Sequence, residues 1–101
     1  MAKREVRSCG FLILRQDKNS GKLEFLILKH LRRLDIPKGH VDKGETDLEC
    51  AYRELQEETG FSRRHLHRVR KFRFELNYDV TDKRDRSRKA RKTLVVFLAR
   101  L

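Results

Sequence analysis

The sequence contains 101 residues, of which 41% are charged and 38% are hydrophobic, and its formal net charge at pH 7 is +11. This length supports one domain with a single small core, and the hydrophobic content argues against disorder of the whole chain. No apolar run approaches the roughly 20 residues of a membrane span, and the charged first residues do not resemble a signal peptide. Cys9 and Cys50 have no metal-binding spacing, and we expect both to be reduced thiols. We therefore expect a cytoplasmic protein without membrane contact.

The charges are unevenly distributed along the chain. Residues 42–58 carry seven acidic and two basic side chains, whereas residues 1–41 carry ten basic and four acidic ones and residues 62–92 carry thirteen basic and four acidic ones. A domain that only coats nucleic acid has little use for such an acidic island. A site that holds a divalent metal and receives a polyphosphate needs both signs of charge.

The first part of the chain is predicted to form a hairpin. Residues 6–15 are an apolar run typical of a buried strand, residues 17–22 are rich in turn formers, and residues 23–30 form a second apolar run. Residues 31–39 are expected to be irregular, and they contain Pro37, the only proline.

A helix is predicted over residues 46–59. Thr46 and Glu49 have the spacing of a capping box, and Gly60 stands where a glycine commonly ends a helix. An apolar stripe predicts the face that packs against the core, and it comprises Leu48, Ala51, Tyr52 and Leu55.

The last third of the chain is predicted to form two strands separated by a charged loop. Alternating apolar residues indicate a half-exposed strand over 66–78, for which an interruption is left open. Residues 79–92 are predicted to form a basic loop, and residues 93–101 a buried strand. That last strand is apolar on both alternations, so it needs cover on both faces of the sheet. Because only one long helix is predicted, we expect one face to lie bare near Val95 and Phe97, with dimerisation or aggregation as the consequence.

Three glutamates, Glu54, Glu57 and Glu58, share one face of the predicted helix. Their repulsion costs helix stability, and the i,i+4 pair of Arg53 with Glu57 offsets only part of it. By itself such a face is typical of a solvated acidic surface, but hard carboxylate oxygens also suit Mg²⁺ or Mn²⁺. Arg53 can hold a glutamate through a bidentate bond, and a carbonyl near Gly39 is a further candidate ligand because glycine permits close approach.

The spacing around these residues favours the metal site. From Gly39 the chain runs through five residues to Glu45 and through seven more to Arg53, and it continues as R-E-L-Q-E-E-T-G-F to residue 61. This is the complete Nudix box, G-x5-E-x7-R-E-U-x-E-E-x-G-U, in which U is a bulky apolar residue. The chain therefore resembles the Nudix hydrolase superfamily.

Segments outside the box resemble the asymmetric diadenosine tetraphosphate hydrolases of that superfamily. They are Pro37 to Val41, Arg7 to Gly10, Glu75 to Tyr78 and Lys92 to Ala99. The resemblance implies an α+β fold, the Nudix α/β/α sandwich around a mixed sheet. It also implies a metal-dependent hydrolase in which water attacks a pyrophosphate bond of a nucleoside or dinucleoside polyphosphate.

The resemblance assigns roles to individual residues. It implies that Glu54, Glu57 and Glu58 hold Mg²⁺ or Mn²⁺, with Arg53 completing the catalytic set, and Glu54 is the best candidate for the general base. The expected substrate-binding residues are Lys38 and Lys92 on phosphates, Tyr78 stacked on adenine, His40 beside the metal loop, and Arg33.

The chain departs from that family in three respects. It stops at Leu101, whereas the family continues with a further strand, a loop and a final helix, so we expect residues 1–101 to be a single Nudix domain that lacks the C-terminal helix. Leu34 and Arg33 stand where the family often has a tryptophan and a histidine. The loop predicted over residues 79–92 is longer and more basic than the resemblance leads one to expect.

Several alternatives stay open at this point. Within the same fold, the substrate could be the 5′ end of an RNA or a diphosphoinositol polyphosphate, because excess positive charge favours any strongly anionic substrate. A nucleic-acid-binding Nudix fragment without catalysis is an alternative of another class, although the intact box argues against it. The basic run from Lys83 to Lys92 could bind RNA through its phosphates, and the oligomeric state is left open.

Overall fold

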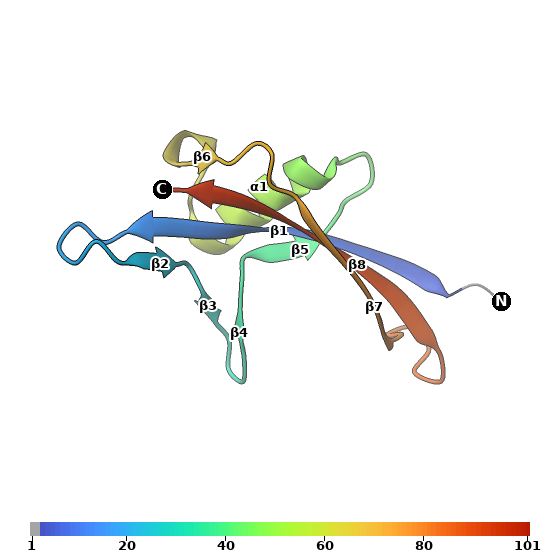
Figure 1. Ribbon diagram of the computed structural model, residues 1–101. Coiled ribbons are helices and arrows are strands. Elements are labelled where there is room, and N and C mark those ends of the chain that lie inside the picture. Colours follow the sequence, from blue (N-terminus) through green and yellow to red (C-terminus); the bar gives the residue numbers. More distant parts are fainter. Residues whose placement is uncertain (1–2) are drawn as a thin grey trace.

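The computed structural model describes residues 3–101 and shows an α+β fold in which one α-helix packs on a curled mixed sheet (Figure 1). The elements in chain order are β1 (Arg4–Gln16), β2 (Leu23–Phe25), β3 (Leu28–Lys29), β4 (Leu34–Asp35), β5 (Lys38–His40), α1 (Asp47–Thr59), the 3₁₀ helix η1 (Arg63–His65), β6 (His67–Arg68), β7 (Phe74–Thr81) and β8 (Lys89–Arg100). Within residues 3–101, neither helix is long and apolar enough to cross a membrane.

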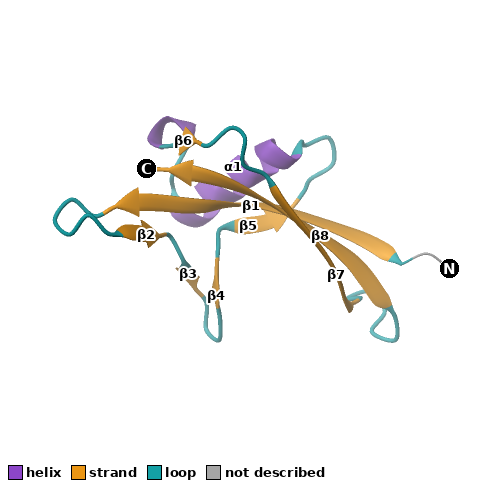
Figure 2. Ribbon diagram, viewed as in Figure 1, coloured by secondary structure: helices purple, strands orange, loops and turns teal. Residues whose placement is uncertain are grey.

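Two long strands, β1 and β8, form the centre of the sheet and run parallel (Figure 2). Their register extends from Arg4 opposite Ala90 to Leu14 opposite Arg100. The outer edge of β1 pairs with β2 and β5, and the outer edge of β8 pairs with β6 and β7, all antiparallel. The predicted mixed sheet is confirmed. The first hairpin is also confirmed, because Leu14 pairs with Phe25.

The helix α1 begins and ends where the sequence predicts. The Thr46 side chain accepts a hydrogen bond from the Glu49 N–H at 3.1 Å, and the Glu49 carboxylate accepts one from the Thr46 N–H at 2.9 Å. The helix ends at Gly60, whose φ of 81° lies in the left-handed region that glycine adopts without a side-chain clash. Local signals alone therefore define this element.

The core lies between α1 and one face of the sheet. Its buried residues are Cys9, Phe11 and Ile13 of β1, Val95, Phe97 and Ala99 of β8, and Cys50, Ala51 and Leu55 of α1. The Phe11 ring centroid lies 4.8 Å from that of Tyr52 and 5.9 Å from that of Phe97. Both cysteines are free, as predicted, and burial raises the pKa of Cys50 to about 11.

Two predicted strands are divided in the structure. The segment over residues 23–30 splits into β2 and β3, because β3 turns to pair with β4 in a separate two-stranded sheet. The segment over residues 66–78 splits into β6 and β7, and a turn separates them in which the Phe72 N–H donates to the Val69 carbonyl at 3.0 Å. The continuous apolar run of residues 25–28 concealed the first break. The second break coincides with the three-residue step from Val69 to Phe72, where the sequence leaves an interruption open.

Half of the loop predicted over residues 79–92 is sheet. Strand β7 continues further and β8 begins earlier than predicted, so only residues 82–88 form the turn. Charged side chains concealed this ladder, in which Val80 pairs with the fully buried Ala90. We call residues 79–91 the hairpin arm.

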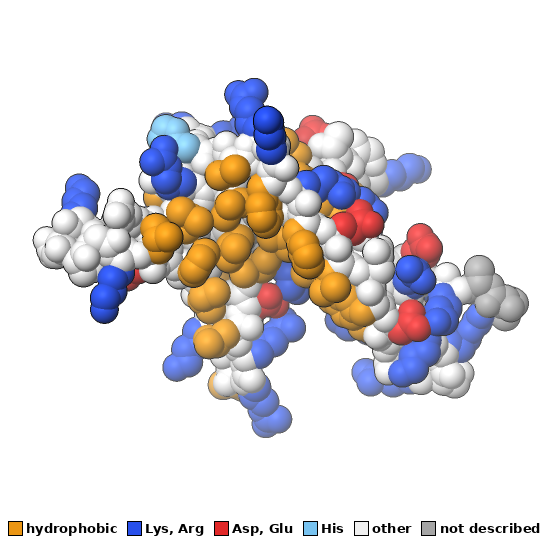
Figure 3. Space-filling view, in the orientation of Figure 1, with side chains coloured by type: hydrophobic (Ala, Val, Ile, Leu, Met, Phe, Trp, Pro, Cys, Tyr) orange, Lys and Arg blue, Asp and Glu red, His pale blue; other side chains and the backbone are white. Residues whose placement is uncertain are grey.

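The face of the sheet opposite α1 has no second layer over it within residues 3–101. Figure 3 shows hydrophobic side chains spread across this face, and Phe74 on β7 is 52% exposed. The prediction of a bare face is confirmed, but the residues named for it were wrong. Val95 and Phe97 are buried beneath α1, because they share an alternation with the core residues of β1, and Val96 lies on the bare face instead.

The bare face should promote self-association. Phe74→Ser should reduce light scattering by concentrated protein and leave the free energy of unfolding almost unchanged, since the side chain is half exposed. As the matched control on the covered face, Val95→Ser should lower the free energy of unfolding by about 3 kcal/mol, because that side chain is fully buried. Equal losses of stability in the two variants would contradict this assignment of faces.

Candidate active site

Strand β5 and helix α1 bring the acidic island against the edge of the sheet. Strand β5 pairs with β1, with Gly39 opposite Cys9. A Cβ added to Gly39 would lie 2.1 Å from Cδ of Glu54, so the Glu54 carboxylate packs directly on the backbone of β5. The Gly39 carbonyl accepts a hydrogen bond from the Cys50 thiol at 3.4 Å. The glycine is thus required by the close approach of the glutamate.

Arg53 binds three glutamates. Its Nε and Nη2 donate to the two carboxylate oxygens of Glu45 at 2.7 and 3.0 Å, and its Nη1 donates to Glu54 Oε1 at 2.8 Å and to Glu57 Oε1 at 3.3 Å. Nη2 also donates to the His40 carbonyl at 2.9 Å. The bonds from Arg53 lower the pKa of Glu45 to about 2. Arg53 therefore joins the loop, β5 and the helix, and it fixes the orientation of Glu54.

Glu58 lies apart from the Arg53 network. Its Oε1 accepts a hydrogen bond from the backbone N–H of Lys38 at 3.2 Å. Burial above all raises the pKa of Glu58, and the charge of Glu54 raises it further. A partly desolvated carboxylate beside another carboxylate gains stability from a nearby cation.

These oxygen donors fit a hard divalent cation. Glu54 and Glu58 contact adjacent residues of β5, and their mutual repulsion is what a cation would relieve. Across residues 3–101, no three metal-ligating side chains are already assembled into a site. Of the three predicted ligands, Glu54 and Glu58 thus lie at β5, whereas the 59% exposed side chain of Glu57 extends along α1 towards Arg53.

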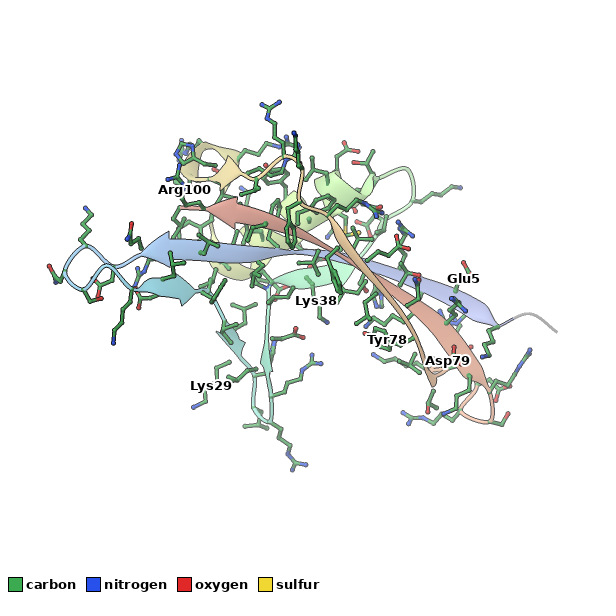
Figure 4. The ribbon with its side chains drawn as sticks, viewed as in Figure 1. Glu5, Lys29, Lys38, Tyr78, Asp79 and Arg100 are labelled. Atoms are coloured by element: carbon green, nitrogen blue, oxygen red, sulfur yellow. The ribbon has the colours of Figure 1, made fainter. Side chains whose placement is uncertain are left out.

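Basic side chains lie on the face of the sheet opposite α1. Lys92 of β8 is the direct neighbour of Tyr78 on β7 and of Val6 on β1. Lys38 of β5 belongs to the same face, and Figure 4 labels both Lys38 and Tyr78. Burial, followed by the charges of Lys92 and other lysines, lowers the pKa of His40. The predicted phosphate-binding residues Lys38 and Lys92 and the predicted stacking residue Tyr78 are therefore brought to one face.

A pocket of about 130 Å³ lies at the base of the hairpin arm. Its charged or titratable lining comprises Arg4, His40, Lys83 and Lys92. Sequence reasoning missed Arg4 and Lys83, because their approach depends on the parallel pairing of β1 with β8. Arg4 and Val6 are two residues apart on β1, so their side chains lie on the same face of the sheet, and Val6 pairs with Lys92. This spacing was the signal in the sequence that placed Arg4 on the face of Lys92.

Arg33 is not brought to this pocket. It lies in the turn between β3 and β4, its side chain is 68% exposed, and its Nη1 lies 3.9 Å from Asp35 Oδ2. Asp35 also binds Lys38 Nζ at 3.1 Å. A phosphate that binds Lys38 must therefore compete with this carboxylate.

The architecture and the motif together define the class of protein. A family model for the NUDIX domain matches residues 5–101. The chain belongs to the NUDIX domain family.

Sequence relatives narrow the comparison. The chain is 41% identical to the rat (Rattus norvegicus) asymmetrical bis(5′-nucleosyl)-tetraphosphatase over an alignment of 101 residues that covers 93% of this chain and 64% of the rat protein. It is 37% identical to the pig (Sus scrofa) protein of the same name, with the same coverage of both chains. The chain thus spans about two thirds of the length of these curated relatives.

Solved structures agree with this placement. A binary complex of a C. elegans Ap4A hydrolase superposes with a TM-score of 0.80 and 31% identity, over 95% of this chain and 66% of that one. A MutT protein from Methanosarcina mazei, at 24% identity and a TM-score of 0.67 over 97% of this chain and 64% of that one, shares the fold.

Proposed function

We propose that this chain hydrolyses a pyrophosphate bond of a dinucleoside polyphosphate such as diadenosine tetraphosphate, by attack of water and with Mg²⁺ or Mn²⁺ as cofactor. The observation that carries the proposal is the Glu54 carboxylate, which is seated on Gly39 and held by Arg53, while the next residue of β5, His40, lines a pocket of cations. The names of the rat and C. elegans relatives supply the substrate class.

In this proposal the carboxylates of Glu54, Glu57 and Glu58 and the Gly39 carbonyl hold the metal. When bound, the ion neutralises phosphate charge and lowers the pKa of its water, which supplies the nucleophile near neutral pH. Arg53 orients Glu54 Oε1 at 2.8 Å, and Glu54 is the residue that we propose takes the proton of the attacking water.

The substrate is proposed to lie across the basic face. Lys92 and Tyr78 are direct cross-strand neighbours, so a base stacked on Tyr78 would place its first phosphates within reach of Lys92. Lys38 then exchanges its bond to Asp35 for a bond to phosphate. His40 faces the same phosphates from β5, and Arg33 extends from its turn towards the distal nucleotide.

Lys92→Ala should act on substrate affinity more than on the fold. Loss of one charge-assisted phosphate contact should raise KM for diadenosine tetraphosphate roughly 10-fold, with a smaller rise for a nucleoside diphosphate and little change in kcat. Lys29→Ala is the matched control, because Lys29 lies on β3, away from the basic pocket (Figure 4). Equal effects of Lys92→Ala on the two substrates would contradict its phosphate-binding role.

Product analysis tests the function directly. Chromatography of a reaction with diadenosine tetraphosphate and Mg²⁺ should show ATP and AMP in equal amounts, and chelation of the metal should stop the reaction. Two substrates, a triphosphorylated RNA and a diphosphoinositol polyphosphate, should turn over more slowly. Preference for either would overturn the proposed substrate class, and turnover of none of the three would overturn the enzymatic proposal.

The proposal also covers the domain organisation of the chain and its cellular compartment. We propose that residues 1–101 act as one domain, because β1 and β8 come from opposite ends of the sequence and pair along their length. Two buried free thiols suit a reducing compartment, so we propose that the domain works in the cytoplasm.

A further inference from the structure

The hairpin arm carries an unusual density of positive charge. Between residues 83 and 91 there are six basic side chains and one acidic side chain. Figure 3 shows Lys and Arg side chains gathered over this end of the molecule. Most of these cations point to solvent and have no assigned role in the proposed reaction.

One carboxylate at the start of the turn of the hairpin arm is buried and hydrogen-bonded. Asp82 is 6% exposed, and it accepts hydrogen bonds from Arg4 Nε at 3.0 Å and from the backbone N–H of Arg84 at 2.9 Å. Its own N–H donates to the Arg88 carbonyl at 2.9 Å, which closes the turn. Asp82 thus fixes the backbone on both sides of Lys83 and ties the arm to the first residue of β1.

Lys83 is directed into the basic pocket by this arrangement. It lines the pocket together with Arg4, His40 and Lys92. Its charge contributes to the lowered pKa values of both His40 and Lys92, after burial in each case. The part of the pocket lining that the structure describes contains no carboxylate, so the lining is cationic.

The pocket begins next to the proposed reaction centre and extends along β1 away from it. Gly39 is opposite Cys9 on β1, and Lys92 is opposite Val6, three residues earlier. His40, which follows Gly39 on β5, lines the near end of the pocket. At about 3.3 Å per residue, Lys92 at its other side lies roughly 10 Å along β1 from the level of Gly39. A single phosphate bound at Glu54 cannot cover that span, whereas a chain of several phosphates can.

We propose that this pocket is a distal phosphate subsite, in which Lys83 binds a phosphate of the polyphosphate chain and the Arg4–Asp82 pair positions Lys83. The inference rests on the proposed function for the identity of the anion. Lys83 is then a ligand-binding residue that favours longer phosphate chains, and Asp82 is a positioning residue. The remaining cations of the arm attract anions without direct contact.

Binding of inorganic tripolyphosphate, measured by calorimetry in buffer with chelator, tests the subsite without reference to turnover. Lys83→Ala should raise the Kd for tripolyphosphate roughly 10-fold, as expected for loss of a charge-assisted hydrogen bond, and should change the Kd for monophosphate much less. Arg86→Ala removes the same charge from the same turn, but Arg86 does not line the pocket. It should change the tripolyphosphate Kd less than 2-fold, and Lys83→Arg should retain most of the affinity. Equal effects of the two alanine variants would overturn the subsite.

For Asp82→Ala, a positioning role and simple electrostatic attraction predict opposite changes in the affinity for tripolyphosphate. Asp82→Ala raises the net charge by one, so electrostatic attraction alone predicts tighter binding of tripolyphosphate. If Asp82 positions Lys83, binding should weaken several-fold instead. Asp82→Asn provides the same change in charge should the alanine variant fail to fold. Tighter binding by the folded variant would overturn the positioning role.

The two proposals fail in distinguishable ways. If Lys83→Ala weakens tripolyphosphate binding in a protein that hydrolyses no dinucleoside polyphosphate, the proposed function is wrong and the subsite stands. If diadenosine tetraphosphate is hydrolysed and Lys83→Ala binds tripolyphosphate as Arg86→Ala does, the subsite alone is wrong.

Discussion

Glu54→Gln is expected to lower turnover of diadenosine tetraphosphate by ~10²–10³, the usual cost of removing a group that acts on charge in the transition state. The substitution removes the proposed proton acceptor and weakens its bond with Arg53, whereas the bidentate pair of Arg53 with Glu45 remains. The fold should therefore persist, and circular dichroism should be unchanged. Glu24→Gln is the control, because Glu24 is an exposed residue of β2 paired with Arg15.

Glu58→Gln extends the same test to the second carboxylate at β5. Turnover should fall to a similar extent, because this variant loses a proposed metal ligand. Thermal stability in metal-free buffer should stay equal or rise, since burial and Glu54 already disfavour the charged form of Glu58. A Glu58→Gln enzyme with full metal-dependent activity would show that the metal site has been assigned to the wrong residues.

Helix α1 and its motif were predictable because their signals are local. The capping box of Thr46 and Glu49 and the terminal Gly60 act within one turn of the helix ends. The spacing from Gly39 to Glu58 likewise lies within one loop and one helix. Interactions of this range can be read from the sequence without knowledge of the sheet.

The basic pocket was not predictable to the same degree. Arg4 and Lys83 line the same pocket because β1 and β8 pair in parallel, and this pairing joins segments from opposite ends of the chain. The apolar pattern also could not show which of the two alternating sets of β8 side chains faces α1, because both sets are apolar. That choice depends on register, since Val95 pairs with the buried Cys9.

The electrostatics of the acidic face differ from the expectation for a similar reason. An i,i+4 pair between Arg53 and Glu57 was visible in the sequence and was expected to offset part of the repulsion. The structure adds Glu45 from the loop and the His40 carbonyl from β5. Arg53 is consequently shared among four carboxylates, those of Glu45, Glu54 and Glu57 and that of Asp42, whose Oδ2 lies 3.4 Å from Nη2. Of its closest bonds to the three glutamates, the one with Glu57, at 3.3 Å, is the longest.

Gly39→Ala is expected to lower kcat by roughly 10² while the free energy of unfolding falls by no more than about 1 kcal/mol. The added methyl group would overlap the Glu54 carboxylate, whose atoms lie 2.1 to 2.4 Å from the Cβ position. The backbone of Gly39 is not in the left-handed region, and the overlapping group is the end of a flexible side chain. Glu54 should therefore rotate away at little cost in stability, and such a displacement is sufficient for the loss of rate.

Gly44→Ala is the control that separates backbone strain from displacement of the glutamate. Gly44 has a φ of 82° and open space around its Cβ position, so alanine there should lower the free energy of unfolding by about 1–2 kcal/mol and leave kcat nearly unchanged. The double variant Gly39→Ala with Glu54→Gln should be no slower than Glu54→Gln alone, because both changes remove the same carboxylate from the same place. Additive losses of kcat in that double variant would show that Gly39 acts on the reaction by a route other than seating Glu54.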